Sequence, residues 1–171
     1  MLIVLCGLPA AGKSALAESL AAALTAPVLS VDPIEAATWR AGVDRGQPTG
    51  VAAYAVAQAL AAENLRLGLT VIVDAVNDAE EARAAWVDLA RDRAVPLRFV
   101  EVVCSDPRVH RQRLLDRRRD LEGFPEPTWE SVQARRAAFV DWPQDRLVLD
   151  SLRPLPELTA RALDHLGSPA G

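Results

Sequence analysis

One glycine-rich stretch near the amino terminus has residue types and spacing suited to phosphate chemistry. Residues 7–14, GLPAAGKS, follow the pattern Gly-x-x-x-x-Gly-Lys-Ser/Thr of the phosphate-binding loop, or P-loop. Gly7 lets the backbone turn sharply away from a strand, and Gly12 lets the main chain approach a phosphate closely. The intervening N–H groups form an anion nest, Lys13 is expected to reach the β- and γ-phosphates, and Ser14 is expected to bind Mg²⁺. The pattern predicts a site for a nucleoside triphosphate and Mg²⁺.

The surroundings of the P-loop strengthen this prediction. Residues 2–6, LIVLC, are typical of a buried parallel strand, and the Ala- and Leu-rich segment 15–24 is typical of a helix whose amino terminus adds its dipole to the site. Lys13 is the only lysine among the 19 Lys and Arg residues, and a compact ammonium on a flexible stem suits phosphate binding. A chance Gly/Ala turn is the alternative, but it does not explain this order of elements. The predicted nucleotide-binding residues of the loop are Gly7, Leu8, Pro9, Ala10, Ala11, Gly12, Lys13, Ser14 and Ala15.

Size and composition indicate a globular protein. The chain has 171 residues, 50% hydrophobic and 25% charged, and we expect one domain over residues 1–166 and a disordered tail over 167–171. The net charge of −4 disfavours a nucleic-acid partner without excluding a local basic patch. Cys6 and Cys104 are expected in the core and predict neither a disulfide framework nor a metal site. The sequence shows no signal peptide and no membrane-spanning run, which predicts a cytoplasmic protein, and it leaves the oligomeric state open.

Strand and helix patterns alternate along the chain. The expected strands are 2–6, 28–31, 69–73, 97–103 and 146–149. The expected helices are 15–24, a short helix from Pro33, 51–67, 79–93, 108–119, a helix after Thr128, and 155–166. This alternation predicts a three-layer α/β/α sandwich with a five-stranded parallel sheet and right-handed crossovers.

Ligands bind at the carboxyl ends of the strands in such a sheet. The P-loop, Asp32, Asp74 and the turn over residues 150–153 all follow predicted strands. We therefore expect these four features to share one crevice.

Taken in this order, the features resemble those of a known group. The chain resembles the small P-loop kinases that include chloramphenicol phosphotransferase, zeta toxins and the kinase domain of polynucleotide kinases. The resemblance spans nearly the whole chain, through the specific P-loop, an Asp after the second strand and an arginine-rich segment. It implies the strand order 2-3-1-4-5, a helical lid at about residues 108–128, and transfer of the γ-phosphate of ATP to a hydroxyl.

Two aspartates are candidates for chemistry in this crevice. The resemblance implies that Asp32 contacts the acceptor hydroxyl and takes its proton, the role of a general base. The alternative is that Asp32 only caps the helix predicted to begin at Pro33. Asp74 ends a strand similar to the Walker B strand, so it is a candidate for the Mg²⁺ shell, for a substrate contact, or for a simple turn with Asn77 and Asp78.

An arginine cluster follows the fourth predicted strand. Arg113 and Arg117 are four residues apart and therefore share a helix face. The resemblance implies that lid arginines reach the nucleotide phosphates and offset the charge that develops there. The alternative is that these arginines lie on a solvent-exposed helix face and pair with nearby acidic residues. The cluster comprises Arg108, Arg111, Arg113, Arg117, Arg118 and Arg119, with Arg135 and Arg136 as further candidates.

The substrate-facing residues are less sharply marked. Trp39 and Arg40, with Tyr54, are candidates for the acceptor pocket, because the resemblance places variable substrate contacts after Asp32. The alternative is that Trp39 and Tyr54 are ordinary core residues. Asn77 is a candidate substrate contact and Arg153 a candidate for stacking on adenine. The sequence has no Asn-Lys-x-Asp motif for guanine, which favours ATP.

The favoured function is an ATP- and Mg²⁺-dependent kinase for a small-molecule hydroxyl, with Lys13, Asp32, Arg113 and Arg117 as catalytic residues. A polynucleotide 5′-hydroxyl kinase is an alternative, but it would need a basic channel with aromatic platforms. A nucleotide-binding switch or a zeta-like toxin is another, and a switch would not need Asp32 as a base. The identity of the acceptor does not follow from the sequence.

Overall fold

The computed structural model of the chain describes residues 1–117, 126–139 and 142–167. Its five strands form one sheet in which every strand pair is parallel, in the order β2-β3-β1-β4-β5. The predicted fold class and strand order are confirmed. The strands are β1 (Leu2–Cys6), β2 (Val28–Ser30), β3 (Val71–Asp74), β4 (Leu97–Val103) and β5 (Arg146–Asp150). The helices are α1 (Lys13–Leu24), α2 (Val31–Arg40), α3 (Thr49–Arg66), α4 (Glu80–Asp92), α5 (Pro107–Asp116), α6 (Trp129–Arg135) and α7 (Leu155–Gly167), with a 3₁₀ helix over Arg136–Phe139.

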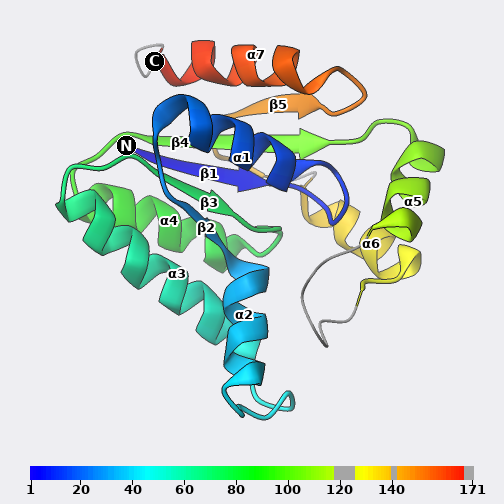
Figure 1. The fold of residues 1–171 in the computed structure, drawn as a ribbon, viewed down its shortest axis with the longest axis horizontal. Helices are drawn as coiled ribbons and strands as arrows, with labels where there is room; N and C mark the ends of the chain where they lie inside the picture. The colour runs from blue at the N-terminus through cyan, green and yellow to red at the C-terminus, as the bar shows by residue number, and fades with distance from the viewer. Residues whose placement is uncertain (118–125, 140–141, 168–171) are drawn as a thin grey trace.

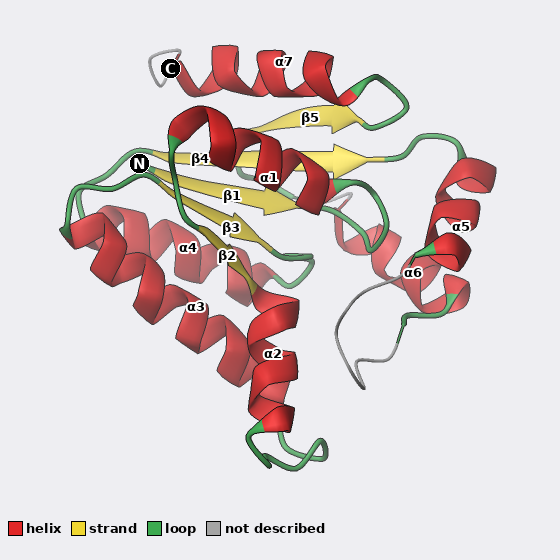
Figure 2. Cartoon of the chain, in the orientation of Figure 1, coloured by secondary structure: helices red, strands yellow, loops and turns green. Residues whose placement is uncertain are grey.

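Helices cover both faces of the sheet (Figure 1). Helices α1 and α7 lie together on one face, and α3 and α4 lie on the other. Helix α2 runs away from the sheet edge, and α5 and α6 lie beyond the carboxyl ends of β1 and β4 (Figure 2). The carboxyl ends of β1, β2 and β3 therefore open toward a space between α2 on one side and α5 and α6 on the other.

Strand β1 is at the centre of the sheet and is completely buried. It pairs with β3 and β4 on its two sides, so that Leu2 lies opposite both Val71 and Leu97. This position explains why its five residues are all apolar, because helices cover both faces of a central parallel strand. It also fixes the point at which the P-loop leaves the sheet.

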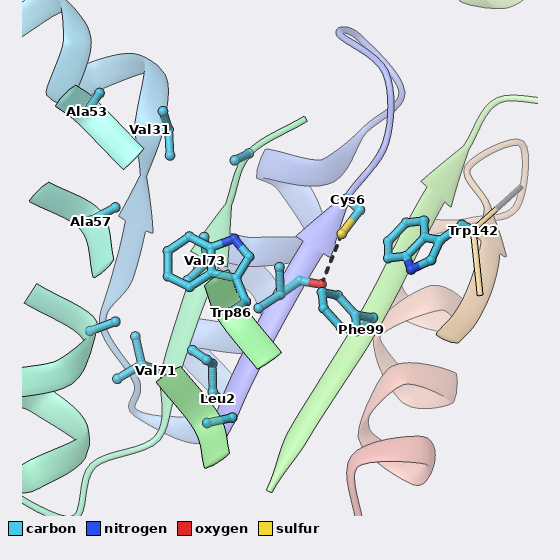
Figure 3. Close-up of a cluster of buried hydrophobic side chains, with 14 of the residues drawn as sticks. Leu2, Cys6, Val31, Ala53, Ala57, Val71, Val73, Trp86, Phe99 and Trp142 are labelled. Carbon is cyan, nitrogen blue, oxygen red and sulfur yellow. Dashed lines mark hydrogen bonds between the residues drawn. The ribbon is translucent and has the colours of Figure 1, made fainter. Parts of the chain in front are cut away.

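Each face of the sheet has its own apolar core. On the α3 and α4 face, Trp86 is fully buried and Phe99 packs edge-on against Trp142 with ring centroids 5.3 Å apart (Figure 3). On the α1 and α7 face, aliphatic side chains such as Leu16 and Leu158 fill the space. Two packed layers hold the strand ends in place, which gives the crevice a rigid floor.

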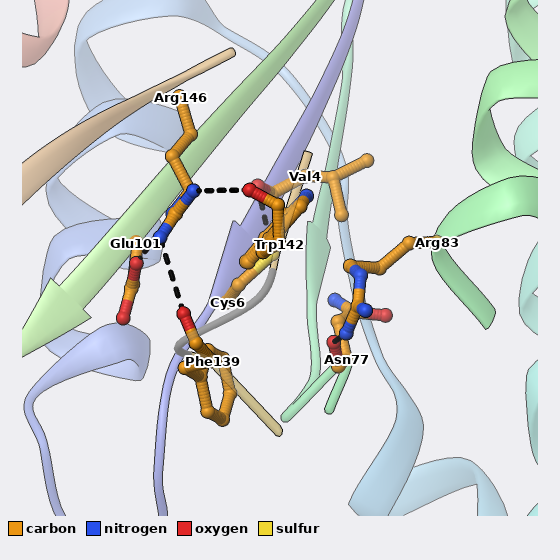
Figure 4. Close-up of polar contacts among 8 residues, drawn as sticks. All are labelled: Val4, Cys6, Asn77, Arg83, Glu101, Phe139, Trp142 and Arg146. Atoms are coloured by element: carbon orange, nitrogen blue, oxygen red, sulfur yellow. Dashed lines mark hydrogen bonds and ion pairs between the residues drawn. The ribbon is translucent and has the colours of Figure 1, made fainter. Parts of the chain in front are cut away.

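A buried polar network ties β5 to the segment before it (Figure 4). The Arg146 Nε donates to the Glu101 Oε2 at 2.6 Å, and its other nitrogens donate to the carbonyl oxygens of Trp142 and Phe139. The guanidinium also lies 4.6 Å from the centroid of the Trp142 ring. Because Glu101 is 6% exposed, its charge is compensated by this partner rather than by water.

Several element boundaries differ from the sequence prediction. The second strand ends at Ser30 rather than Val31, and α2 begins at Val31, so Asp32 lies in the first turn of the helix and does not cap it. The cap interpretation was wrong because the helix begins before Pro33, which is tolerated in a first turn, so that Ser30 and not Asp32 takes the N-cap position. Asp106 and Thr128 cap α5 and α6, because each side chain accepts a hydrogen bond from a backbone N–H group of the first turn.

Some predictions fall outside the described residues. Arg118, Arg119 and the middle of the predicted 108–128 lid belong to residues 118–125, and the predicted tail is described only at Gly167, which ends α7. Among the described residues, α5 ends at Asp116. No helix in the described part of the chain is long and apolar enough to cross a membrane.

Candidate active site

The P-loop connects β1 to α1 through residues held in left-handed conformations. Gly7 has φ +132°, and a Cβ there would lie 2.2 Å from the Val102 carbonyl oxygen. Gly12 has φ +107° and stands directly before α1, and Ala10 has φ +62° between them. The glycine at position 7 is therefore required both by the backbone angle and by the close approach of β4. The first turn of α1 contains no acidic residue of its own, so the helix does not neutralise the positive end that faces the loop.

Lys13 is 7% exposed and its ammonium lies within the loop. The Nζ donates to the Leu8 carbonyl oxygen at 3.1 Å. Burial lowers the pKa of Lys13, and the carboxylates of Asp74 and Asp32 oppose this by favouring its charged form. The ammonium is thus a desolvated cation, whose interaction with phosphate oxygens is stronger than in water.

Ser14 and Asp74 bring two oxygen ligands together at the mouth of the loop. The Ser14 hydroxyl donates to the Asp74 Oδ2 at 2.7 Å, and the Ser30 hydroxyl lies 3.5 Å from the same oxygen. A hydroxyl and a carboxylate are hard donors that fit Mg²⁺, which keeps several waters and phosphate oxygens and needs few protein ligands. Within residues 1–117, 126–139 and 142–167, no group of three or more His, Cys, Asp and Glu is arranged to hold a metal.

A cavity of about 190 Å³ opens between the P-loop and the start of α2. Asp32 lines it, together with Asp74 from β3 and Lys13 from α1. The remaining lining residues are Pro9, Ser14, Glu18, Ser30, Pro33, Ala75, Val76 and Arg117. The cavity therefore brings together three of the four features predicted to share one crevice, the P-loop, Asp32 and Asp74, whereas the turn over residues 150–153 does not line it. We call this cavity the acceptor cavity.

A second cavity of about 180 Å³ adjoins the P-loop, the start of α1 and the arginines of the α5 segment, and we call it the phosphate cavity. Its walls are formed by Ala10, Gly12, Lys13, Ser14, Ala15, Arg113 and Arg117. Lys13, Ser14 and Arg117 line both cavities. The two cavities therefore share a wall made of two cations and one hydroxyl, and Asp32 lines only the acceptor cavity.

The two predicted lid arginines lie at different places in this arrangement. Arg113 donates to the Ser151 hydroxyl at 2.7 Å and to its carbonyl oxygen at 3.0 Å, which ties α5 to the turn after β5. Arg117 lies just beyond the end of α5, and its guanidinium is 3.8 Å from the Glu126 carboxylate. The sequence did not indicate Ser151 as the partner of Arg113.

The other predicted site residues are placed outside the two cavities. The Trp39 Nε1 donates to the Thr49 hydroxyl, and Arg40 is exposed at the far end of α2. Arg153 is exposed and pairs with Glu157 at 2.6 Å. The Asn77 side chain is fully buried, where it donates to the Leu5 carbonyl and accepts from the Trp86 Nε1. Because both ends of this amide are engaged in the interior, its observed role is to hold the turn after β3.

His110 is a residue that sequence reasoning missed. It is 1% exposed, and its Nε2 is 2.8 Å from the Pro9 carbonyl oxygen, so α5 is attached to the P-loop. Its ring packs edge-on against Trp129 of α6. Burial lowers the pKa of His110, and the nearby charge of Arg136 lowers it further. The only available signal was a single histidine within a basic helix.

Solved structures of kinases share this fold. A candidate kinase from Chloroflexus aurantiacus superposes with a TM-score of 0.76 at 22% identity, covering 99% of this chain and 97% of that chain. The APS kinase CysC of Mycobacterium tuberculosis, in complex with AMPPNP and APS, gives 0.70 at 20% identity, covering 98% and 97%. Chaetomium thermophilum Kti12, in complex with ADP-AlF3, gives 0.70 at 20% identity, covering 98% and 100%. These likenesses show that the chain has a P-loop kinase fold.

A comparison with curated proteins finds no match. A comparison with family models finds one described as an AAA domain, which matches residues 2–139 and so includes the P-loop, Asp32, Asp74 and the described part of the arginine segment. This match covers most of the chain and both cavities. The chain is therefore a member of the AAA domain family.

Proposed function

We propose that the protein transfers the γ-phosphoryl group of Mg²⁺-ATP to a hydroxyl of a small molecule, with Asp32 as general base. The observation that carries this proposal is the wall shared by the phosphate cavity and the acceptor cavity, made by Lys13, Ser14 and Arg117. A phosphoryl group held at this wall lies next to the cavity that Asp32 lines. Phosphoryl transfer depends mainly on such alignment and on charge stabilisation.

Different residues have different roles in the proposed reaction. The P-loop amides and Lys13 hold the β- and γ-phosphates, and Ser14 and Asp74 would hold Mg²⁺, which supplies charge neutralisation when bound. The acceptor hydroxyl oxygen attacks the γ-phosphorus, the bond from that phosphorus to the β-phosphate oxygen breaks, and the hydroxyl proton passes to Asp32. Lys13 and Arg117 face the charge that grows on the phosphoryl oxygens.

The relatives are consistent with a small-molecule acceptor. Solved structures with this fold include a sugar kinase, a gluconokinase and an APS kinase. The finer likeness to chloramphenicol phosphotransferase, zeta toxins and polynucleotide kinases remains a prediction from the sequence. The roles proposed for Arg113, Arg153, Trp39 and Arg40 also remain predictions, and of these four only Arg113 lines either cavity.

The substitution Asp32→Asn tests the proposed base. Asparagine keeps the size of the side chain but cannot take up the proton, so we expect transfer to the acceptor to fall by a factor of roughly 10² to 10⁴. ATP binding and the melting temperature should change little, because asparagine keeps the shape of the side chain and Asp32 does not line the phosphate cavity. Turnover by the Asp88→Asn variant, which changes an exposed carboxylate on α4, should match the wild type.

Near wild-type transfer by Asp32→Asn would exclude Asp32 as the base. A protein that binds ATP and changes conformation, but transfers no phosphate to any hydroxyl, would instead support the nucleotide-switch alternative. The acceptors for this assay come from a mass-shift screen of metabolites and antibiotics incubated with the protein and Mg²⁺-ATP.

A further inference from the structure

A third cavity, of about 630 Å³, lies between the first halves of α3 and α4, and we call it the α3–α4 groove. Figure 1 shows these two helices side by side on one face of the sheet. Cavities of a few hundred cubic ångströms are the usual size for small-molecule sites. The groove is lined by Gly50, Val51, Tyr54, Ala55, Gln58, Asp78, Ala79, Glu81 and Ala82.

The groove adjoins the acceptor cavity through the loop that joins β3 to α4. Ala75 and Val76 of this loop line the acceptor cavity, and Asp78 and Ala79 line the groove. Between them, the buried Asn77 donates its backbone N–H to the Tyr54 hydroxyl at 3.1 Å. Burial raises the pKa of Tyr54, and the carboxylates of Asp78 and Asp32 raise it further. One carboxylate from each cavity therefore acts on the same neutral phenol.

The described residues that line the acceptor cavity and the α3–α4 groove include more carboxylates than basic groups. The acceptor cavity has three carboxylates, those of Glu18, Asp32 and Asp74, and its two cations, Lys13 and Arg117, also face the phosphate cavity. The groove has the carboxylates of Asp78 and Glu81 and no basic residue among its described lining. An anionic acceptor would therefore have to compete with the nucleotide for the cations of the shared wall.

Basic side chains also approach the groove from outside its lining: the Arg83 Nη1 donates to the Asp78 carbonyl oxygen at 2.6 Å, and Arg135 pairs with the Asp78 carboxylate. The Arg135 Nε lies 3.6 Å from the Asp78 Oδ2, and both side chains are partly exposed, so the pair is screened by water. Two arginines near α2 line neither the acceptor cavity nor the groove. Arg40 is at the exposed end of the helix, and the Arg45 guanidinium lies 4.8 Å from the centroid of the Trp39 ring. Glu81 is the second carboxylate of the groove lining, beside Tyr54 and Asp78 in the same set of residues.

We propose that the acceptor is a hydroxylated amine, such as an amino sugar, whose ammonium binds between the Tyr54 ring, Asp78 and Glu81 while a hydroxyl lies at Asp32. An aromatic face beside carboxylates is a favourable environment for an ammonium group. The apolar side chains of the groove, such as Val51 and Ala55, would cover the carbon skeleton. This inference rests on the proposed kinase function and adds the charge class of its substrate.

Equilibrium binding in the presence of Mg²⁺-AMPPNP tests the charge class without requiring turnover. The probes are glucosamine and kanamycin, each beside its N-acetylated form, together with glucose and gluconate. We expect at least one amine to bind tenfold or more tightly than its N-acetylated form and than glucose and gluconate, and to bind more weakly at high salt. Equal or tighter binding of the neutral or anionic probes, or no amine binding at millimolar concentration, would overturn the inference.

Two adjacent glutamates provide a matched pair of variants. Glu81 lines the groove, whereas Glu80, beside it in the first turn of α4, does not. We expect Glu81→Gln to weaken binding of the amine roughly threefold to tenfold, and Glu80→Gln to leave it unchanged. Equal effects of the two substitutions would exclude a specific contact in the groove.

Failure of this inference is distinguishable from failure of the kinase function. Phosphorylation of gluconate or glucose that depends on Asp32, without any preference for amines, would overturn the substrate class and leave the kinase function standing. Absence of Mg²⁺-AMPPNP binding would instead contradict the kinase function itself.

Discussion

Two arginines at the end of α5 differ in what surrounds them. Arg117 lines both cavities, whereas Arg113 lines the phosphate cavity and is bound to Ser151. Arg117 can therefore face a phosphoryl group in transit from one cavity to the other. This position suits a cation that acts on charge developing in the transition state.

The substitution Arg117→Ala should therefore lower kcat more than it raises the Kd for ATP. A loss of about 10- to 1,000-fold in kcat is expected from removing one preorganised cation. Arg111→Ala is the matched control, because Arg111 is exposed on the same helix and lines neither cavity. Weaker ATP binding with unchanged kcat would show that Arg117 binds the ground and transition states equally.

At the scale of elements, the β1–loop–α1 unit and the parallel sheet were predictable from the sequence. Their determinants are local: a continuous apolar run, glycines at fixed spacing and repeated alternation of patterns. The contacts of His110 with Pro9 and of Tyr54 with Asn77 were not predictable, because they join residues 101 and 23 positions apart. Such contacts depend on how helices pack across the sheet, which no local pattern records.

The close approach of β4 to the P-loop predicts a large cost for Gly7→Ala. A Cβ at Gly7 would collide with the Val102 carbonyl oxygen, whereas one at Gly68, which also has positive φ, meets nothing within 4 Å. Gly68→Ala should lower the free energy of unfolding by about 1 to 2 kcal/mol through the backbone angle alone. Gly7→Ala should cost at least about 2 kcal/mol more in urea unfolding. Equal losses of unfolding free energy in the two variants would mean that β4 moves away from the added Cβ at no energetic cost.

The tether between α5 and the P-loop predicts a pH dependence. The pKa of buried His110 is lowered, so between its folded pKa and the unfolded value of about 6.5 the unfolded chain binds more protons. The free energy of unfolding should therefore fall as the pH falls from 6.5 toward 5. The facing cations Lys13, Arg113 and Arg136 act in the same direction.

Urea unfolding between pH 5 and 8 measures this effect. In the His110→Asn variant, the free energy of unfolding should no longer fall in this way between pH 6.5 and 5. A variant of the other histidine, His165→Asn, should keep the wild-type pH dependence. A slope that persists in His110→Asn would assign the dependence to other groups.

At the scale of the whole molecule, the sheet order places the groups to which we assign roles in the proposed reaction. Strand β1 supplies the P-loop and β3 supplies Asp74, while β2 leads into Asp32, and these three strands are adjacent in the order β2-β3-β1. Strands β4 and β5 lead to α5 and to the turn that holds Arg113. The phosphate side and the acceptor side of the crevice thus come from opposite halves of one sheet, with β1 between them.

The central claim is transfer of a phosphoryl group across the wall that the two cavities share. The direct measurement is transfer of label from [γ-³²P]ATP to a panel of hydroxyl compounds that includes amino sugars, sugars, sugar acids and a 5′-hydroxyl oligonucleotide. We expect a labelled small molecule that forms only when Mg²⁺ is present, at a rate lowered at least about 10²-fold by Lys13→Ala. Full activity of Lys13→Ala, or ATP binding by the wild type without a labelled small-molecule product, would contradict the account.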